Sequence, residues 1–306
     1  MGGKLQLGKS SKRKFRRDGK TSEGIIMFGS EYSNHPEMLL DSFKDMSSAY
    51  KKGFRRKESK LIRFLERLYL RIFGIPEIGF QVRGQYFMDM LKKNISTKKP
   101  ERILDAGSGI GTYTFWLSEK YKDSIVDGWE IDKTKLEFSR KFAKELGARN
   151  VNFLYGDVTK SSPKNKNKYD LIVSVDVLEH IDDFKGVLRN FYQLLEKGGY
   201  LFVHTPQINQ QRIFKQTKEW HHDEHLHEGF SPGELKKELA DVGFKIIEVR
   251  ETFGFFGKLA WELNHMLLPK GFIASGIVYP FLYCISRLDL LTKNKRGLGT
   301  AVLVKK

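Results

Sequence analysis

Three acidic residues of this sequence each follow a short apolar run, at positions where a carboxylate can bind a ligand. Asp105 lies near the end of the run RILDA, and only Ala106 separates it from the glycine-rich turn GSGIG at residues 107–111. Glu130 and Asp157 stand at the ends of the next two apolar runs of the chain. Parallel strands bring their carboxyl ends to one edge of a sheet, so these three carboxylates are expected to share one site.

The chemistry of this arrangement indicates a nucleoside ligand that carries an amine and lacks phosphates. The glycines have the spacing GxGxG, and glycine lets the backbone turn sharply and approach a ligand closely. A carboxylate at Asp105, beside that turn, favours a cationic amine over a phosphate. Glu130 can accept hydrogen bonds from two ribose hydroxyls, and Asp157 can accept one from an exocyclic adenine amine. The pattern therefore predicts a site for an aminoacyl nucleoside at the switch point of an open sheet.

The elements that must position these residues alternate between strand and helix from Pro100 onward. Such alternation predicts a parallel sheet that is covered by helices on both faces. The capping box SPGE at 231–234 opens a helix that Gly243 ends. Strands are predicted at 102–106, 124–129, 151–155, 170–175, 200–204, 244–250 and 299–304, and helices at 81–94, 112–120, 133–146, 183–195 and up to 242.

Five segments of the chain carry a resemblance to a known family. They are ILDAGSGIGTYT (103–114), GWEID (128–132), GDV (156–158), YDLIVSVDVLEHI (169–181) and LEKGGYLFVHTP (195–206). In this order and spacing the chain resembles the class I S-adenosylmethionine-dependent methyltransferases, and among them the quinone- and sugar-pathway type of bacteria. The resemblance implies a Rossmann-like, doubly wound α/β fold with a seven-stranded sheet of order 3-2-1-4-5-7-6, whose last strand is antiparallel.

The resemblance also implies which residues bind the cofactor. The motif GWEID offers Asp132 as an alternative to Glu130 for the ribose, and we assign the ribose to Glu130. Arg83, in the helix before the first strand, is assigned to the carboxylate of the cofactor. The complete cofactor set is Asp105, Gly107, Ser108, Gly109, Glu130, Asp157, Val158 through its backbone, and Arg83.

Two clusters of acids and histidines supply candidates for the acceptor side. Methyl transfer from a sulfonium needs in-line alignment and, for a hydroxyl acceptor, a base that removes the proton. The motif DVLEH contains Asp176, Glu179 and His180, of which His180 is the predicted base. The segment HHDEHLHE at 221–228 adds His225 to the catalytic candidates.

The same residues leave a metal site open as an alternative. Glu179 and His180, together with His225 or His227, resemble the ligands of the small-RNA 3′-terminal 2′-O-methyltransferases, in which EVIEH precedes a later histidine. Asp176 stands here in place of the first glutamate of that motif. We therefore assign no metal, and metal-dependent RNA 2′-O-methylation and a non-catalytic cofactor-binding module remain alternatives.

The net charge of +17 is concentrated near the two ends of the 306 residues. Residues 1–20 carry +7 and residues 287–306 carry +5. A nucleic-acid-binding protein usually spreads its basic residues over one face, so nucleic acid is the less favoured partner and an anionic membrane surface is the alternative. The single cysteine, Cys284, excludes an internal disulfide and predicts a cytoplasmic protein, with peripheral attachment to the inner face of the membrane as an option.

The predicted organisation has three parts. Residues 1–57 form a basic arm, residues 58–99 form N-terminal helices, and residues 100–306 form the methyltransferase domain. Residues 253–296 are an insertion before the last strand, and the uncharged stretch 271–286 within it is either a lid or a membrane-contacting segment. These features predict O-methylation of a small or lipid-linked acceptor, such as a quinone, an isoprenoid or a glycan, at the membrane surface.

Overall fold

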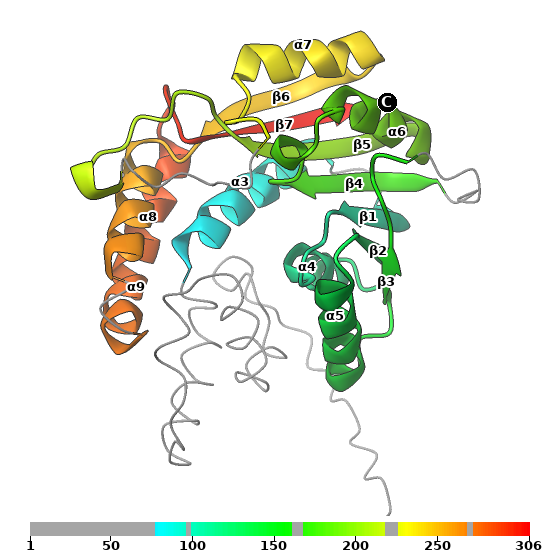
Figure 1. Cartoon of the computed structure of the whole chain (residues 1–306), viewed down its shortest axis with the longest axis horizontal. Helices are drawn as coiled ribbons and strands as arrows, with labels where there is room; N and C mark the ends of the chain where they lie inside the picture. The colour runs from blue at the N-terminus through cyan, green and yellow to red at the C-terminus, as the bar shows by residue number, and fades with distance from the viewer. Residues whose placement is uncertain (1–76, 96–98, 161–167, 218–225, 268–271) are drawn as a thin grey trace, which may run out of the picture.

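The computed structural model describes residues 77–95, 99–160, 168–217, 226–267 and 272–306. These residues form one seven-stranded sheet that is flanked by helices (Figure 1). The predicted basic arm and the predicted helix that begins at residue 58 lie outside the described residues, and so does His225.

The strand order is β3-β2-β1-β4-β5-β7-β6, which confirms the order that the resemblance implied. Strands β1 to β5 pair in parallel, whereas β7 is antiparallel to both of its neighbours. The order reverses between β1 and β4, and such a reversal opens a crevice at the carboxyl ends of these strands. The strands are β1 (Arg102–Ala106), β2 (Ile125–Glu130), β3 (Val151–Tyr155), β4 (Tyr169–Val175), β5 (Leu195–Pro206), β6 (Lys245–Thr252) and β7 (Gly299–Lys305).

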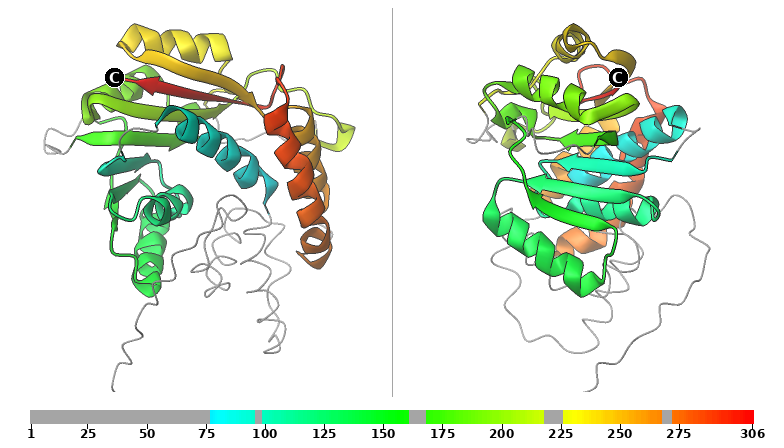
Figure 2. Two further views of the ribbon diagram at one scale, coloured as in Figure 1. Left: turned by 180° about the vertical axis from the view of Figure 1, so that it is seen from behind. Right: turned by 90° about the vertical axis from the view of Figure 1, so that its right-hand side faces the viewer.

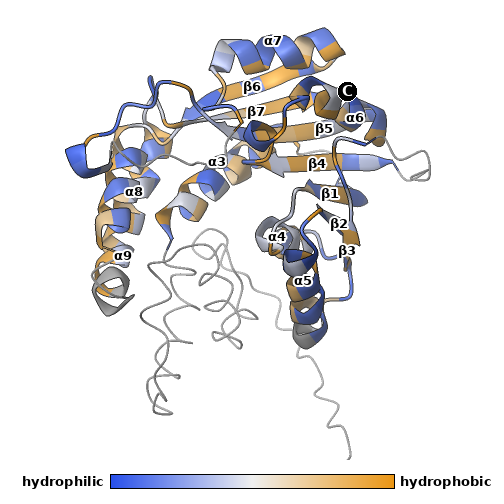
Figure 3. Ribbon diagram, in the orientation of Figure 1, coloured by the Kyte–Doolittle hydropathy of each residue, from blue (hydrophilic) through white to orange (hydrophobic). Residues whose placement is uncertain are grey.

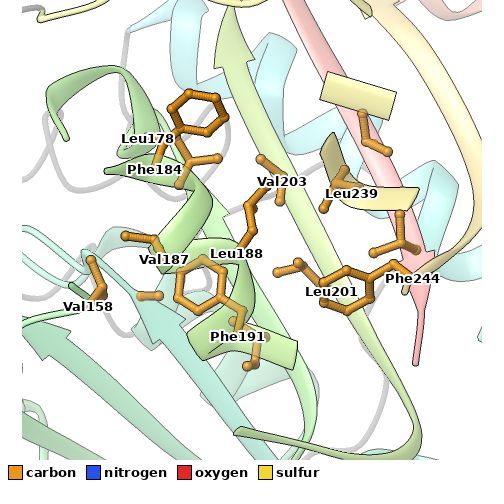
Figure 4. Close-up of a cluster of buried hydrophobic side chains, with 14 of the residues drawn as sticks. Val158, Leu178, Phe184, Val187, Leu188, Phe191, Leu201, Val203, Leu239 and Phe244 are labelled. Carbon is orange, nitrogen blue, oxygen red and sulfur yellow. The ribbon is translucent and has the colours of Figure 1, made fainter. Parts of the chain in front are cut away.

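Helices α6 (Phe184–Leu194) and α7 (Pro232–Val242) bury their apolar residues against one face of the sheet. Figure 4 shows Phe191 and Leu188 of α6 beside Leu201 of β5. The strand β5 begins at Leu195 rather than at the predicted residue 200, because Leu195 already pairs with Tyr169. Successive side chains of a strand point to opposite faces of the sheet. One half of the strand side chains therefore packs in this core, and the other half packs on the opposite face.

Helices α3 (Ile78–Asn94), α4 (Thr112–Lys120) and α5 (Lys133–Leu146) pack on the opposite face. Phe87 of α3 lies edge-on to Phe202 of β5, with 4.7 Å between the ring centroids. Phe142 of α5 contacts Phe115 of α4 in the same way, at 5.3 Å. Asp132 caps α5 by accepting hydrogen bonds from two backbone amides of its first turn.

A helical hairpin lies between β6 and β7 in the chain, where the sequence predicted a hydrophobic insertion. It consists of α8 (Phe255–Leu267), α9 (Phe272–Arg287) and the short 3₁₀ helix η6 (Leu288–Leu291). Trp261 of α8 and Tyr279 of α9 belong to a third apolar cluster, which they share with Ile78 and Val82 of α3. Figure 2 shows α8 and α9 side by side beyond α3, at one end of the sheet. Among the described helices, none has both the length and the apolar character needed to cross a membrane.

Candidate functional site

The glycine-rich turn follows β1 at the switch point of the sheet. Gly107 and Gly109 both have positive φ values, of 77° and 56°, which glycine adopts without the steric cost that other residues incur. A Cβ atom at Gly107 would come within 2.5 Å of the Val177 side chain, so the turn packs against the end of β4. A Cβ atom at Gly109 would meet no atom within 4 Å, so the turn also faces open space.

Asp105 lies at the end of β1 and is buried beneath this turn. Its Oδ2 accepts a hydrogen bond of 2.6 Å from the hydroxyl of Thr114 on α4. Burial raises the pKa of Asp105 to about 7, and the nearby carboxylate of Glu130 acts in the same direction. The site thus holds a buried carboxyl group whose pKa lies well above that of an exposed aspartate.

Glu130 lies at the end of β2 and holds the turn in place. Its Oε2 accepts a hydrogen bond of 2.7 Å from the amide of Gly109, and its Oε1 accepts from the amides of Ile131 and Asp132 at 2.9 and 2.8 Å. A carboxylate offers about four acceptor positions, so one remains for a ligand hydroxyl. Asp132, the alternative ribose ligand, instead uses its carboxylate to cap α5.

Asp157 and Val158 follow β3, on the far side of Glu130 from the turn. Asp157 accepts hydrogen bonds from the amide and the hydroxyl of Thr159, at 3.0 and 2.6 Å, and pairs with Lys160 at 3.2 Å. The hydroxyl of Thr159 lowers the pKa of Asp157, so this carboxylate is ionised at neutral pH. The Val158 side chain packs in the core, and its carbonyl accepts a hydrogen bond from Asn190.

Asp176 joins three elements immediately after β4. It has a φ of 53°, an uncommon backbone conformation that requires support from its surroundings. Its Oδ1 lies 2.6 Å from Nδ1 of His204 on β5, and its Oδ2 lies 2.6 Å from Nε of Arg83 on α3. The structure therefore places Arg83, which the sequence assigned to the cofactor carboxylate, on a catalytic candidate.

His204 is a site residue that the sequence analysis missed. It is buried, and its Nε2 lies 2.9 Å from the hydroxyl of Thr252 at the end of β6. Its only signal in the sequence is a polar residue near the end of an otherwise apolar strand, in the motif LFVHTP. That signal does not identify its partners, because Asp176 and Thr252 come from other strand ends.

A small pocket opens beside this group of residues, between the ends of β4 and β5, α3 and α8. Two cations lie on aromatic rings at its wall. The guanidinium of Arg212 lies 4.6 Å from the Trp261 ring centroid, and that of Arg83 lies 5.5 Å from the Phe253 ring centroid. Burial lowers the pKa of Arg212, although the neighbouring Glu262 opposes this effect. The residues that line the pocket include Arg83, Asp176, His204, Arg212, Phe253 and Trp261.

The other acceptor-side candidates lie around η3 (Leu178–His180). Glu179 is fully buried, and neither of its carboxylate oxygens has a hydrogen-bond partner among the described residues. Burial, with the nearby Asp176 carboxylate, raises the pKa of Glu179 well above its usual range. His180, the predicted base, is exposed and is not among the residues that line the pocket. His227 contacts the ring of Phe184, and the described residues contain no group of three metal-ligating side chains that could hold an ion.

The residues around the turn fit S-adenosylmethionine. Ser108, between the two glycines, is buried, and its hydroxyl has no hydrogen-bond partner among the described residues, so a ligand can supply one. Glu130 retains an acceptor position for a ribose hydroxyl, and Asp105 can take the charged form that a cationic amine would favour.

Comparison with known proteins identifies a methyltransferase-domain family model that matches residues 80–249. The chain is 28% identical over 236 residues to phosphoethanolamine N-methyltransferase 3 of Arabidopsis thaliana, which covers 72% of this chain and 45% of that protein. It is 30% identical over 118 residues to pavine N-methyltransferase of Thalictrum flavum subsp. glaucum, which covers 39% of this chain and 33% of that protein. The chain thus spans less than half the length of these relatives. Their names describe N-methylation, whereas the sequence analysis placed the chain closest to quinone- and sugar-pathway enzymes.

Two solved structures share the fold. Phosphoethanolamine N-methyltransferase 2 of Haemonchus contortus, in complex with S-adenosyl-L-methionine, has a TM-score of 0.52 at 17% identity, over 72% of this chain and 52% of that one. The [4+2]-cyclase SpnF has a TM-score of 0.50 at 12% identity, over 92% of this chain and 97% of that one. The names of these two proteins describe different reactions, so the fold does not determine the reaction, which depends on the side chains of the site.

Proposed function

Because this chain belongs to the methyltransferase-domain family, we propose that it transfers the methyl group of S-adenosylmethionine to the nitrogen of a small acceptor that also carries an anionic group. When bound, the cofactor supplies a methyl group that is already activated on a sulfonium sulfur. The residues of the chain then have to hold donor and acceptor in line. The observation that carries the proposal is a pocket with the cation of Arg212 on Trp261 and the carboxylate of Asp176.

On the cofactor side, the methionine end, the ribose and the adenine are each bound at the end of a different strand. Asp105 and the turn at 107–109 hold the methionine end, because Asp105 is buried and can pair with an amine. Glu130 holds the ribose through its remaining acceptor position, and Asp157 with the Val158 backbone positions the adenine. Arg83 is not assigned to the cofactor, because its Nε pairs with Asp176.

On the acceptor side, Arg212 recognises the anionic group. Among the described residues, no carboxylate forms an ion pair with its guanidinium, which lies on the Trp261 ring. Glu262 is close, but its carboxylate accepts hydrogen bonds from the amides of Ile213 and Phe214 and from the hydroxyl of Thr217. The positive charge of Arg212 is therefore available to a phosphate or carboxylate of the acceptor.

The pocket favours an amine over the hydroxyl acceptor that the sequence analysis expected. A hydroxyl needs a base to take its proton as it reacts. An ammonium group can first lose its proton to water, and the neutral amine then attacks the methyl group with its own lone pair, which leaves a methylated ammonium and S-adenosylhomocysteine. His180 lies outside the pocket, and both ring nitrogens of His204 are engaged, by Asp176 and Thr252. Asp176 orients the acceptor by accepting a hydrogen bond from the amine. A lipid-linked acceptor is the second candidate, favoured by the exposed apolar residues of α9.

The test is a comparison of two amine acceptors that differ only in a phosphate group. Full-length protein is supplied with S-adenosylmethionine and either phosphoethanolamine or ethanolamine, and release of S-adenosylhomocysteine is measured. We expect kcat/KM for the phosphorylated amine to be higher by roughly tenfold or more, the scale of one charge-assisted hydrogen bond. Arg212→Gln should remove this preference and leave cofactor affinity unchanged. Lys215→Gln, an exposed cation of the same segment, is the matched control. Turnover of uncharged hydroxyl acceptors in place of anionic amines would overturn the proposal.

A further inference from the structure

The helix α9 and the adjoining η6 expose a row of apolar residues that the proposed N-methylation of a small acceptor does not use. Ile277 is 74% exposed and Phe281 is 68% exposed, and Leu291 in η6 is 82% exposed. Cys284 and Leu288 lie between them and are also exposed. The spacing of four and three residues places Ile277, Phe281 and Cys284 on one face of α9, and Leu288 continues the row at the start of η6. Solvent exposure of so many large apolar side chains in one row indicates an interaction surface.

The opposite face of α9 holds the hairpin against the rest of the molecule. Tyr279, Leu282 and Ser286 are buried, and the first two belong to the apolar cluster shared with α3 and α8. Ser286 also accepts, through its carbonyl, a hydrogen bond of 2.8 Å from Gln85 of α3. One face of α9 is therefore packed against the rest of the protein, and the exposed apolar row lies on its other face.

The exposed charges of the segment that carries this row have one sign. Between residues 255 and 296 the only acidic residues are Glu262 and Asp289, and both are fully buried. The exposed charged side chains between residues 277 and 296 are all basic: Arg287, Lys293, Lys295 and Arg296. An apolar face that is bordered by cations is the pattern of helices that lie in the interface of an anionic bilayer.

We propose that the row Ile277–Phe281–Cys284–Leu288–Leu291, with the adjoining basic residues, docks on the surface of an anionic lipid bilayer. Figure 1 shows α8 and α9 at one end of the sheet, away from α6 and α7, and Figure 3 shows how apolar α9 is. The apolar side chains enter the interface while the basic side chains pair with lipid phosphates. The inference goes beyond the proposed function, since the pocket at Asp176 and Arg212 is lined by other residues.

Vesicle flotation of the full chain tests this surface. The probes are vesicles of phosphatidylcholine alone and vesicles that also contain about 30% phosphatidylglycerol, enough to give a negative surface potential. We expect flotation with the anionic vesicles only, and a loss of roughly tenfold in binding for the double variant Ile277→Ser, Phe281→Ser. Lys293→Gln with Lys295→Gln should weaken binding to anionic vesicles as well.

Two controls show whether the row on α9 itself carries the binding. Leu154→Ser changes an exposed apolar residue of β3, at the other edge of the sheet, and should leave flotation unchanged. Cofactor affinity and the far-ultraviolet circular dichroism of each variant report whether it is folded. Folded Ile277→Ser, Phe281→Ser protein that floats as well as the unchanged chain would overturn the proposal, because the basic ends alone would then bind lipid. A dimer that this variant disrupts, without any flotation, would overturn it in favour of a second copy of the chain.

Discussion

At the scale of single residues, the proposed role of Asp105 in cofactor binding predicts that this binding depends on pH. Its folded-state pKa of about 7 lies above that of an exposed aspartate, because burial disfavours the charged form. Between about pH 4 and pH 7, the folded protein without ligand therefore keeps a proton on Asp105 that the unfolded chain has released. The contribution of Asp105 to stability falls as pH rises through this range. A bound cationic amine reverses this preference, because it stabilises the ionised carboxylate.

We therefore expect the affinity for S-adenosylmethionine to rise roughly tenfold between about pH 5.5 and pH 7.5, as Asp105 ionises. Calorimetric titration at several pH values measures this profile. Asp105→Asn should bind more weakly and show a flat profile. Thr114→Val removes the hydrogen bond that lowers the pKa of Asp105, so it should move the rise to higher pH. An unchanged profile in both variants would remove Asp105 from the amine-binding role.

At the scale of elements, Asp289 of η6 connects the helical hairpin to the rest of the protein. It is fully buried and accepts hydrogen bonds from the hydroxyl of Tyr86 on α3 at 2.8 Å and from the amides of Gly254 and Gly257 at 2.9 Å. A Cβ atom at Gly257 would come within 2.7 Å of this carboxylate, so the start of α8 lies directly on it. The position of Trp261, and with it the wall of the pocket, depends on this connection.

Asp289→Ala should lower the free energy of unfolding by about 3 kcal/mol, because it leaves several buried donors without an acceptor. Tyr86→Phe removes only one of these donors and should cost about 1 kcal/mol. Denaturant unfolding of the two variants beside the unchanged chain measures both values. Equal losses in the two variants would show that Asp289 does not act as the common acceptor.

At the scale of the whole molecule, the two halves of the site come from different parts of the fold. The residues proposed to bind the cofactor lie at the ends of β1, β2 and β3, whereas the pocket takes Phe253 and Trp261 from the segment between β6 and β7. Thr252 and Gly299 are opposite each other in the antiparallel pair of β6 and β7, so a short turn can replace the residues between them.

Replacement of residues 253–298 by an Asn-Gly turn should therefore separate the two functions. We expect cofactor affinity to remain within about threefold, since none of the residues removed lies at the ends of β1 to β3. Methyl transfer should be abolished, and stability should fall because Ile78 and Val82 of α3 lose their cover. Cofactor titration and S-adenosylhomocysteine release on one preparation measure both properties. Methyl transfer at the original rate would show that the acceptor binds elsewhere.

The elements and the cofactor edge follow from local patterns in the sequence. Alternating apolar runs, the glycine turn at 107–111 and the acids Asp105 and Glu130 at strand ends each lie within a few residues of the structure they determine. The shift of the start of β5 to Leu195 has a different origin, because pairing with Tyr169 extends the strand beyond its own apolar run.

The acceptor side is decided by contacts between residues that are distant in the chain. Arg83 could be placed on a helix from its sequence, but its pairing with Asp176 exists only because α3 packs across the end of β4. Arg212 meets Trp261 in the same way, because Glu262 holds residues 213–217 against α8. Helical and strand periodicity specify which face of an element is apolar, but not which other element covers it. The sequence by itself therefore determined the sheet and the acidic residues at the ends of its strands, and only tertiary packing decided which side chains line the pocket beside Asp176.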